Sequence, residues 1–293
     1  MALLTGKVAI VTGAGGGIGR AHALLLAKEG AAVVVNDLGG SVDGSGEGSR
    51  VADEVVKEIR DAGGMALANF GSVTDADEAQ AMVDAAVAEF GRLDILINNA
   101  GILRDKSFKK MDEDLWDSVI AVHLKGTYHA TRAAYARMIE QGEGGRIIMT
   151  SSTSGLIGNF GQTNYGAAKA GIAGFMRCLA IEAKKANVTV NVLAPNAYSR
   201  MTAPLFPEGS EKRFAPDKVS PAIVWLCSDE AADITGQQFV ISGNRVSLLY
   251  PAQFRIASDD ESEDNWTPEE IGQKIKASMA DWPKAATVPE LVF

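Results

Sequence analysis

A glycine-rich turn between an apolar strand and a helix constrains this chain more than any other segment. Residues Lys7–Gly13 (KVAIVTG) are apolar and β-branched, which is typical of a strand buried in a parallel sheet. The segment Arg20–Gly30 (RAHALLLAKEG) has helical character and ends at a glycine, a common stop signal. The turn between them, Thr12–Gly19 (TGAGGGIG), therefore predicts a βα unit whose helix N-terminus can receive a phosphate group.

The glycines of this turn have separate roles in a dinucleotide site. Gly13 allows the tight turn, Gly17 lets the backbone approach a pyrophosphate, and Gly19 permits close packing of the helix on the strand. We expect these three glycines and Ile18 to bind the cofactor. The alternative is a loop that only reverses the chain, but the strand-turn-helix context favours the dinucleotide.

An acidic residue ends the second predicted strand. Asp37 follows the apolar run AAVVVN and lies 18 residues after Gly19. A carboxylate in this position accepts hydrogen bonds from the adenosine ribose hydroxyls and repels a ribose phosphate. Asp37 therefore predicts NAD rather than NADP as the cofactor. The alternative is a turn residue before Gly39-Gly40.

Strands and helices alternate along most of the chain, without internal repeats or long linkers. This order predicts one α/β domain of the doubly wound Rossmann type, with about seven parallel strands and helices on both faces of the sheet. We assign this domain to residues 1–245. Residues 246–293 form a C-terminal extension with a short helix, because Thr267 and Glu270 have the spacing of a capping box. The strands are expected at Lys7–Gly13, Ala31–Asp37, Met65–Val73, Leu93–Gly101, Gly144–Ser152, Val188–Asn196 and Gly236–Gly243.

The carboxyl ends of parallel strands meet at one edge of a sheet, and the sequence places polar residues at these ends. We expect them to form one composite cofactor and substrate site. Asn98 and Asn99 end the fourth strand, and the alternative for both is a structural amide. Besides the glycine turn and Asp37, the expected cofactor contacts are Ser72, Val73, Asn99, Ala100, Gly101, Tyr165, Lys169 and Thr202.

A tyrosine and a lysine four residues apart carry the chemistry expected at this edge. On a helix, Tyr165 and Lys169 project from the same face, and an ammonium beside a phenol favours the phenolate. Because tyrosine normally titrates near pH ~10, this pairing would bring the phenol closer to neutral pH. The hydroxyl of Ser152, 13 residues before Tyr165, would hold a substrate oxygen against the phenol. The alternative for YxxxK alone is an amphipathic helix with a solvated lysine.

Composition limits the partners of the chain. The formal net charge of −9 argues against nucleic acid or an anionic membrane surface as the main partner, and no apolar stretch approaches the roughly 20 residues that span a bilayer. The three histidines form no cluster and the two cysteines have apolar neighbours, so we expect no metal site and two buried, reduced thiols. The N-terminus lacks signal-peptide character and the C-terminal LVF is no peroxisomal address, which predicts a cytoplasmic protein.

Together, the glycine turn, Asn98-Asn99-Ala100-Gly101, Ser152 and Tyr165-x-x-x-Lys169 resemble the short-chain dehydrogenase/reductase family over roughly the first 245 residues. The resemblance implies hydride transfer between nicotinamide and a carbinol or ketone. It also implies that Tyr165 is the general acid/base and that Ser152 hydrogen-bonds the substrate oxygen. Lys169 would bind the nicotinamide ribose and lower the pKa of Tyr165.

Longer segments resemble one branch of this family, the (3R)-hydroxyacyl-CoA dehydrogenase domain of the peroxisomal multifunctional enzyme and its stand-alone bacterial relatives. They are VVVNDLGG, NNAGILRDKSF, VHLKGTYHATRAA, GRIIMTSSTSGLIGNFGQTNYGAAKAG and APNAYSRMT. This resemblance implies an NAD-dependent oxidoreductase that oxidises the hydroxyl of a 3-hydroxyacyl-CoA with a fatty or steroid side-chain acyl group. Alternatives are a dehydrogenase of a free steroid or another secondary alcohol, and a 3-oxoacyl carrier-protein reductase, which usually uses NADPH.

Two side-chain roles stay open at this level. His123 in VHLKG stands where many family members have an asparagine that holds a proton-relay water, so it is either a catalytic relay or a packed helix histidine. Lys212 and Arg213 lie in the loop expected to line the substrate entrance, where they either meet CoA phosphates or form a solvated surface pair.

A subunit interface is implied by the resemblance and by one helix face. The helix after Tyr165 carries small residues on one side, and in the family this helix and the long one before it form a dimer. We therefore expect a homodimer or homotetramer, with the C-terminal extension docked on a neighbouring subunit. The alternative is that the small face packs on the sheet of its own subunit. The small residues are Gly166, Ala170 and Gly174.

Overall fold

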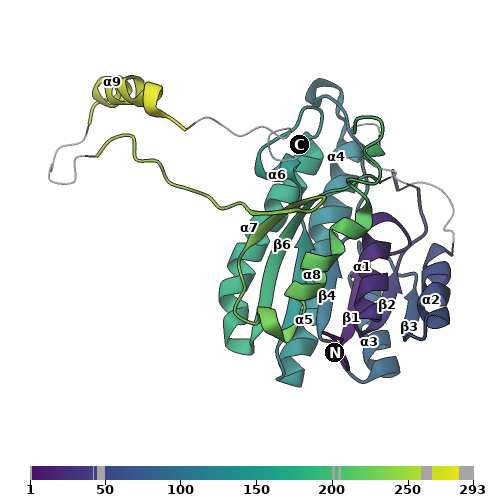
Figure 1. The fold of residues 1–293 in the computed structure, drawn as a ribbon. Coiled ribbons are helices and arrows are strands. Elements are labelled where there is room, and N and C mark those ends of the chain that lie inside the picture. Colours follow the sequence, from purple (N-terminus) through teal and green to yellow (C-terminus); the bar gives the residue numbers. More distant parts are fainter. Residues whose placement is uncertain are drawn as a thin grey trace.

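The computed structural model describes residues 2–41, 43–44, 50–199, 202–203, 206–258 and 266–283. These residues form an eight-stranded sheet with helices on both faces (Figure 1). The strand order is β3-β2-β1-β4-β5-β6-β7-β8, and every neighbouring pair is parallel except β7 and β8. The strands are β1 (Val8–Thr12), β2 (Ala32–Asn36), β3 (Ala66–Asn69), β4 (Ile95–Asn98), β5 (Gly145–Thr150), β6 (Val188–Asn196), β7 (Gln238–Ser242) and β8 (Arg245–Leu248).

The strand order changes direction between β1 and β4. The chain moves from β1 outward to β2 and β3 and then returns to place β4 on the other side of β1. In an open parallel sheet, this switch point creates a crevice at the carboxyl ends of the strands, where ligands bind. The predicted doubly wound Rossmann fold is confirmed, and it puts the glycine-rich turn at the edge of that crevice.

The sheet differs from the predicted seven parallel strands by an eighth, antiparallel strand, β8. Gly243 (φ +57) and Asn244 connect Ser242 to Arg245, and this two-residue turn pairs β8 antiparallel to β7. The sequence pattern does not reveal β8, because its side chains are mostly exposed and Arg-Val-Ser-Leu lacks the apolar run of the central strands. The sheet therefore continues past residue 245 into the predicted extension.

Two helical layers enclose the sheet (Figure 1). One layer covers the sheet face that carries Val11 and Val33, and the other covers the face that carries Ile10 and Val34. Because both faces are buried, the central strands are apolar at nearly every position. The first layer holds α1 (Gly17–Lys28), α2 (Val51–Asp61) and α8 (Ser220–Leu226), and the second holds α3 (Ala76–Phe90), α5 (Gly126–Gln141) and α7 (Thr163–Ala183).

Two more helices lie near the carboxyl edge of the sheet, namely α4 (Glu113–Ile120) and α6 (Thr153–Leu156) (Figure 1). Helix α4 continues into α5 through a π-helical turn, η2 (Ala121–Lys125). The long helix predicted at residues 112–141 is therefore present, with an irregular turn in its middle. Short 3₁₀ turns are η1 (Phe108–Lys110), η3 (Lys184–Ala186), η5 (Pro216–Lys218), η6 (Asp229–Ala231) and η7 (Met279–Asp281).

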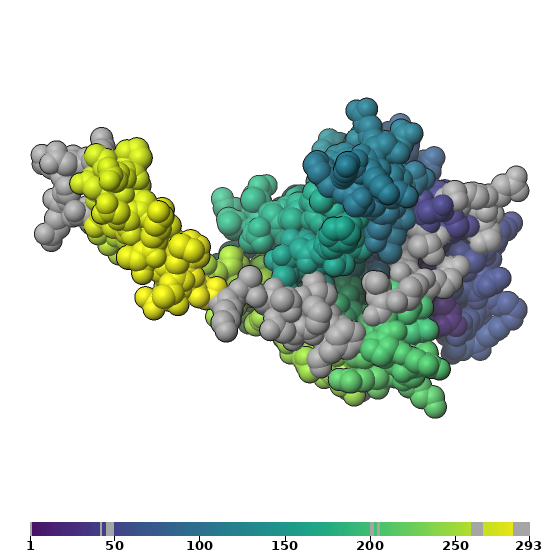
Figure 2. Space-filling model, turned by 90° about the horizontal axis from the view of Figure 1, so that it is seen from above, coloured from purple at the N-terminus to yellow at the C-terminus, as the bar shows by residue number. Residues whose placement is uncertain are grey.

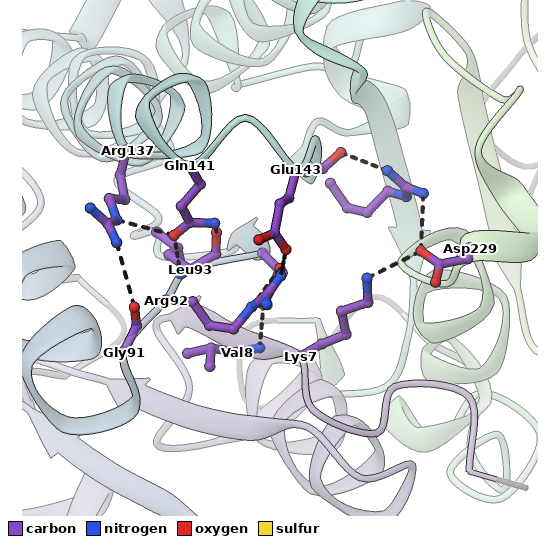
Figure 3. A network of polar contacts seen from close by, with 12 residues as sticks. Lys7, Val8, Gly91, Arg92, Leu93, Arg137, Gln141, Glu143 and Asp229 are labelled. Carbon is purple, nitrogen blue, oxygen red and sulfur yellow. Dashed lines mark hydrogen bonds and ion pairs between the residues drawn. The ribbon is translucent and has the colours of Figure 1, made fainter.

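A charged network ties the strands together at the opposite, amino edge of the sheet (Figure 3). Arg92 donates hydrogen bonds to both carboxylate oxygens of Asp94 and to Glu143 (2.7 Å). Asp94 is buried and also accepts the backbone N–H of Val8 (2.8 Å). Since these residues begin or precede β1, β4 and β5, the network fixes the strand starts and leaves the carboxyl edge to the site.

The chain leaves the sheet after β8 as an extended arm. Residues 249–258 form neither helix nor strand, and α9 (Pro268–Ser278) stands away from the body of the molecule (Figures 1 and 2). The predicted capping box is confirmed, because Thr267 Oγ1 accepts the Glu270 N–H (3.2 Å) and the Glu270 carboxylate accepts the Thr267 N–H (2.8 Å). None of the residues of α9 is buried, so this helix does not pack on the core.

The thiols correct one expectation from the sequence. Cys227 is buried as predicted, but the prediction for Cys178 is wrong, because Cys178 lies on the outer side of α7 and is exposed. In the described part of the chain, no group of histidine, cysteine and carboxylate side chains is arranged to hold a metal ion. Within the same residues, every helix is too short or too polar to span a bilayer.

A completely buried histidine joins α1 to α8. The Nδ1 atom of His22 lies 2.9 Å from the hydroxyl oxygen of Ser220, which is also buried. The Nε2 atom of His22 has no hydrogen-bond partner among the described residues. Burial lowers the pKa of His22 to about 3, so the ring is neutral in the folded protein. In the unfolded chain it would titrate near pH ~6.5.

The free energy of unfolding should fall as the pH decreases below about 6.5, because the unfolded chain then binds a proton that the folded His22 does not. At about pH 5, His22 alone is expected to lower the free energy of unfolding by roughly 2 kcal/mol. His22→Gln should lose this component. Urea unfolding between about pH 5 and 7 measures how the free energy of unfolding changes with pH in the wild type and in the variant. The buried His123 contributes equally in both proteins, so its contribution cancels when the two slopes are subtracted. Equal slopes for the two proteins would contradict the assignment.

Candidate active site

The glycine-rich turn at the end of β1 is packed too closely to accept larger residues. A Cβ on Gly13 (φ +62) would lie 2.7 Å from the Cα of Ala100, and a Cβ on Gly19 would lie 2.3 Å from the carbonyl oxygen of Gly13. Gly17 (φ +53) begins α1, and its added Cβ would meet only the Cβ of Ser199, at 3.9 Å. The backbone at this helix N-terminus is therefore open to a ligand.

Asn99 fixes this turn to the end of β4. Its Nδ2 donates to the carbonyl oxygens of Thr12 and Gly13 (both 3.0 Å). The Thr12 hydroxyl accepts the backbone N–H groups of Asn99 and Ala100 (3.0 and 3.1 Å). Asn99 and Ala100, both predicted cofactor residues, therefore shape the glycine turn. Asn98 is buried and donates to a threonine hydroxyl of α5, which is a structural role.

Asp37 lies beside the glycine turn, directly after β2. Its two carboxylate oxygens accept the backbone N–H groups of Gly15 (2.8 Å) and Gly39 (2.7 Å). Each oxygen keeps a lone pair, so the carboxylate can also accept hydrogen bonds from ribose hydroxyls. The open helix N-terminus and this carboxylate match the pyrophosphate and the ribose of a dinucleotide, so the donor and acceptor set fits such a cofactor.

The remaining predicted cofactor residues lie near the same edge. Ser72 and Val73 follow β3, where the Ser72 N–H is bound to the carboxylate of Glu78 (2.6 Å). Ile18 packs against the core behind the glycine turn. Thr202 donates its hydroxyl hydrogen to the carbonyl oxygen of Ala197, so it closes its own loop after β6.

Tyr165 and Lys169 both lie on α7, one turn apart, as predicted. Lys169 is 2% exposed; its Nζ donates to the carbonyl oxygen of Thr150 at the end of β5 (2.6 Å) and lies 5.4 Å from the ring centroid of Tyr165. The Ser152 hydroxyl accepts the N–H of Ser154 (3.1 Å), and it lies near enough to Tyr165 to lower the pKa of the phenol. The structure therefore brings the three residues of the predicted catalytic group together.

Burial controls the protonation of this group. It raises the pKa of Tyr165 to about 12; the hydrogen bond with Ser152 lowers this pKa and the carboxylate of Asp105 raises it. Burial also lowers the pKa of Lys169 to about 7, so the lysine is only partly charged at neutral pH. The protein groups alone therefore keep the phenol protonated at neutral pH. The sequence predicts that the ammonium of Lys169 lowers the pKa of Tyr165. In the structure, burial disfavours the charged form of both residues, so it raises the pKa of the phenol and lowers that of the lysine.

His123 lies in the π-helical turn η2, next to Tyr165. The two rings are edge to face with centroids 5.1 Å apart, and His123 Nε2 lies 2.8 Å from the carbonyl oxygen of Ile102. A Cβ on Gly101 would lie 2.3 Å from the imidazole, so only glycine leaves room for the ring. Burial and the charge of Lys169 hold the pKa of His123 well below its usual value. The imidazole is therefore neutral.

Three polar groups of the site were not anticipated from the sequence. The Thr150 hydroxyl and the Asn196 side-chain nitrogen are buried without a hydrogen-bond partner among the described residues. The Asp105 carboxylate acts on Tyr165 from a loop. Thr150 and Asn196 are the last residues of β5 and β6. The predicted strand ends could therefore have placed both residues at the carboxyl edge of the sheet. Asp105 has no such signal, because the loop path decides where its side chain lies.

Comparison with known sequences finds one family. The family model for short chain dehydrogenases matches residues 7–208. A short-chain type dehydrogenase/reductase of Mycobacterium tuberculosis is 51% identical over 83% of this chain and 84% of its own length. The mouse peroxisomal multifunctional enzyme type 2 is 50% identical over 83% of this chain, which spans only 32% of that enzyme. The hydroxyacyl-CoA dehydrogenase ChsB1 of Mycobacterium tuberculosis is 41% identical over 94% of this chain and 90% of its own length.

Solved structures agree with this grouping. A short chain dehydrogenase from Mycobacterium avium superposes with a TM-score of 0.85 at 43% identity, covering 98% of this chain and 99% of that one. A carveol dehydrogenase from Mycobacterium avium, crystallised in complex with NAD, has a TM-score of 0.75 at 27% identity and covers 82% of this chain and 98% of its own.

Proposed function

The chain belongs to the short-chain dehydrogenase family, and we propose that it is an NAD-dependent dehydrogenase of 3-hydroxyacyl-CoA thioesters. The observation that carries the chemistry is the group of Ser152, Tyr165 and Lys169 beside a turn that fits a dinucleotide. The substrate class is supported by two relatives, one named as a hydroxyacyl-CoA dehydrogenase and one as a peroxisomal multifunctional enzyme.

The residues that would hold the cofactor are the glycine turn, Asp37 and Lys169. The N–H groups at the start of α1 would face the pyrophosphate. Asp37 favours NAD because a ribose phosphate would approach its carboxylate, and the related carveol dehydrogenase was crystallised with NAD. Bound NAD⁺ would accept the hydride that leaves the β-carbon of the substrate.

The proton of the substrate hydroxyl is the part of the reaction that the protein handles. We assign its transfer to the phenol oxygen of Tyr165, with the Ser152 hydroxyl holding the substrate oxygen by a hydrogen bond. Because the pKa of Tyr165 is raised to about 12, the phenolate fraction grows with pH. Oxidation should therefore become faster toward alkaline pH, whereas the reverse reduction uses the protonated phenol.

His123 fits a positioning role better than a proton relay. Its Nε2 is held by the backbone of Ile102, and the ring supports Tyr165 from the side. Since its pKa is held well below the usual value, His123 does not gain or lose a proton in the working pH range. We therefore infer that it keeps the phenol in place.

Two alternatives use the same catalytic group. One is a dehydrogenase of a free steroid or another secondary alcohol, and the other is a 3-oxoacyl carrier-protein reductase, which Asp37 disfavours through its preference for NAD. Lys212 and Arg213 are both exposed, and the Arg213 guanidinium lies 5.0 Å above the ring of Phe214. The exposed pair is accessible to CoA phosphates, but its position alone does not select CoA over a smaller substrate.

The C-terminal arm supports an oligomer. Helix α9 carries an apolar stripe at helical spacing, and an isolated helix of 11 residues is marginal in water. The arm before it exposes further large apolar side chains, so we propose that the arm packs on a second copy of the chain. The stripe consists of Ile271 and Ile275 of α9 and continues with Met279 of η7 and Trp282 after it; the apolar residues of the arm are Tyr250, Phe254 and Ile256.

The small face of α7 is only partly covered within the subunit. A Cβ on Gly155 of α6 would lie 2.6 Å from the backbone nitrogen of Ala170, and a Cβ on Gly166 would lie 3.2 Å from the carbonyl oxygen of Ser154, so α6 packs closely on the start of this face. Ala170 is nevertheless exposed, and a Cβ on Gly174 would meet only the side chain of Arg177, at 3.8 Å. The rest of the face is therefore open to a second copy, and a subunit interface there stays a proposal.

Wild-type protein should form NADH from 3-hydroxyacyl-CoA thioesters, measured over a range of acyl lengths and with steroid side-chain thioesters. Tyr165→Phe should lower this rate by at least about a hundredfold, because the general acid/base is lost. The matched controls are the same acyl groups on N-acetylcysteamine, free secondary alcohols, and NADP in place of NAD. Retained activity in Tyr165→Phe, or turnover of free alcohols alone, would sink the assignment.

His123→Ala should lower kcat by about tenfold at every pH, because a neutral support of the phenol is lost without a change in any titrating group. The pH dependence of kcat in the variant should therefore be parallel to that of the wild type. A relay histidine predicts a change in the shape of this profile. Full activity across the pH range would remove His123 from the site altogether.

Removal of residues 250–293 should reduce the number of copies in each particle, because the arm contributes to the contact between copies. Sedimentation equilibrium measures this number from the particle mass divided by the mass of one truncated chain. A finer test replaces two residues of the apolar stripe, Ile275→Glu with Met279→Glu. The control is Lys276→Glu. Residue 276 lies between the two substituted residues in sequence but not in the apolar stripe, so this variant changes the charge of the helix and leaves the stripe intact. The idea fails if the full chain is monomeric, or if the stripe variant and the control assemble alike.

A further inference from the structure

The segment after β4 is bound to the residues at the start of α7. The N–H of Lys106 donates to the carbonyl oxygen of Gly161 (2.9 Å), and Asn164 Nδ2 donates to the carbonyl oxygen of Arg104 (3.0 Å). Asp105 lies between these two backbone ties. Its carboxylate therefore reaches the loop that leads from Ser152 to Tyr165.

A glutamine that directly precedes α7 binds the Asp105 carboxylate. Gln162 is 7% exposed, and its Nε2 donates to Asp105 Oδ2 at 2.6 Å. Its Oε1 accepts the Ser154 hydroxyl (2.7 Å) and the side-chain nitrogen of Asn159 (3.1 Å). One buried amide thus ties two other residues of the loop to Asp105. The orientation of this amide is set by Asp105, which can only accept when ionised.

The chain of hydrogen bonds continues to the predicted catalytic serine. Ser154 holds Gln162 through its side chain, and its backbone N–H donates to the Ser152 hydroxyl (3.1 Å). Ser152 in turn acts on the phenol of Tyr165, whose pKa it lowers. The carboxylate of Asp105 is therefore connected to the substrate-facing hydroxyl by an unbroken set of contacts through Gln162 and Ser154.

We propose that Asp105 is a positioning residue of the reaction, which holds the loop of residues 152–162 and the Ser152 hydroxyl in place through Gln162. The kinetic test of this proposal rests on the proposed function, because it measures thioester oxidation. The structural test, amide hydrogen exchange, does not depend on that function. Asp105 itself is exposed and does not need to touch the reacting atoms.

The charge of Asp105 adds a second, separable effect on the same site. The groups next to Tyr165 are Ser152 from the loop, Lys169 from its own helix and His123 from η2, while Asp105, bound to Gln162, acts on the phenol through its charge. Of these, His123 is neutral and the Asp105 carboxylate raises the pKa of Tyr165. Removing the charge should lower that pKa, so more phenolate would be present at a given alkaline pH.

Three variants separate position from charge. Asp105→Asn removes the charge but keeps an oxygen that accepts from Gln162. Asp105→Ala removes both the charge and the acceptor. Gln162→Leu removes the tie but keeps the charge, in a side chain of similar size. The control is Asp114→Asn, an exposed carboxylate on α4 that makes no contact with Gln162 among the described residues.

The measurements are the pH dependence of kcat for thioester oxidation at saturating NAD, and amide hydrogen exchange of residues 152–162 in the free protein. Asp105→Asn should move the rising limb of the pH profile to lower pH with unchanged exchange. Gln162→Leu should speed exchange and lower kcat about tenfold without moving the limb. Asp105→Ala should show both effects, and Asp114→Asn neither.

Unchanged exchange in both Asp105→Ala and Gln162→Leu would overturn the positioning role, even if the pH profile moved. Faster exchange in both with unchanged kinetics would also overturn it, because the loop would then not position the reacting groups. If wild-type protein oxidises no thioester, the proposed function fails. The exchange experiment still decides whether the Asp105–Gln162 contact orders the loop.

Discussion

The close approach of two backbone segments, the glycine turn after β1 and Asn99-Ala100 after β4, is the constraint on which the site depends. No side chain fits between Gly13 and Ala100, and the amide of Asn99 closes the contact by bonding two carbonyl oxygens of the turn. Because both segments leave strands on either side of the switch point, the contact fixes the crevice in which a cofactor lies. Asp37 extends the same frame by binding the Gly15 N–H.

Burial is the second constraint on the site, because it sets which side chains are protonated. Lys169 is held by a carbonyl oxygen instead of a carboxylate, so nothing compensates its loss of water and its pKa falls. Tyr165 responds to the same surroundings in the opposite direction. A neutral phenol, a partly charged lysine and a neutral His123 then stand together, so this buried group carries less than one full positive charge at neutral pH.

The sequence predicted the parts of this arrangement that depend on local spacing. Tyr165 and Lys169 share a helix face, and the glycine turn and Ser152 follow apolar strands, so chain order alone places them at one edge. Strand β8 escaped prediction because its exposed side chains carry no burial pattern. Asp105 escaped because its contact with Gln162 joins residues 57 positions apart, and no period or motif encodes such a pair. The protonation of Tyr165 escaped because desolvation is a property of the packed site.

The π-helical turn between α4 and α5 is a change of phase within one continuous helix. An α-helix advances about 100° per residue, and a π turn accommodates one residue more before the ladder resumes. The residues before Ala121 and after Lys125 therefore do not belong to the same helical wheel, although the helix has no break between them. A single-residue deletion here would restore regular geometry, but it would rotate α4 relative to α5 and carry His123 away from the phenol. The irregular turn thus sets the register between the half of the helix that packs on the sheet and the half that borders the site.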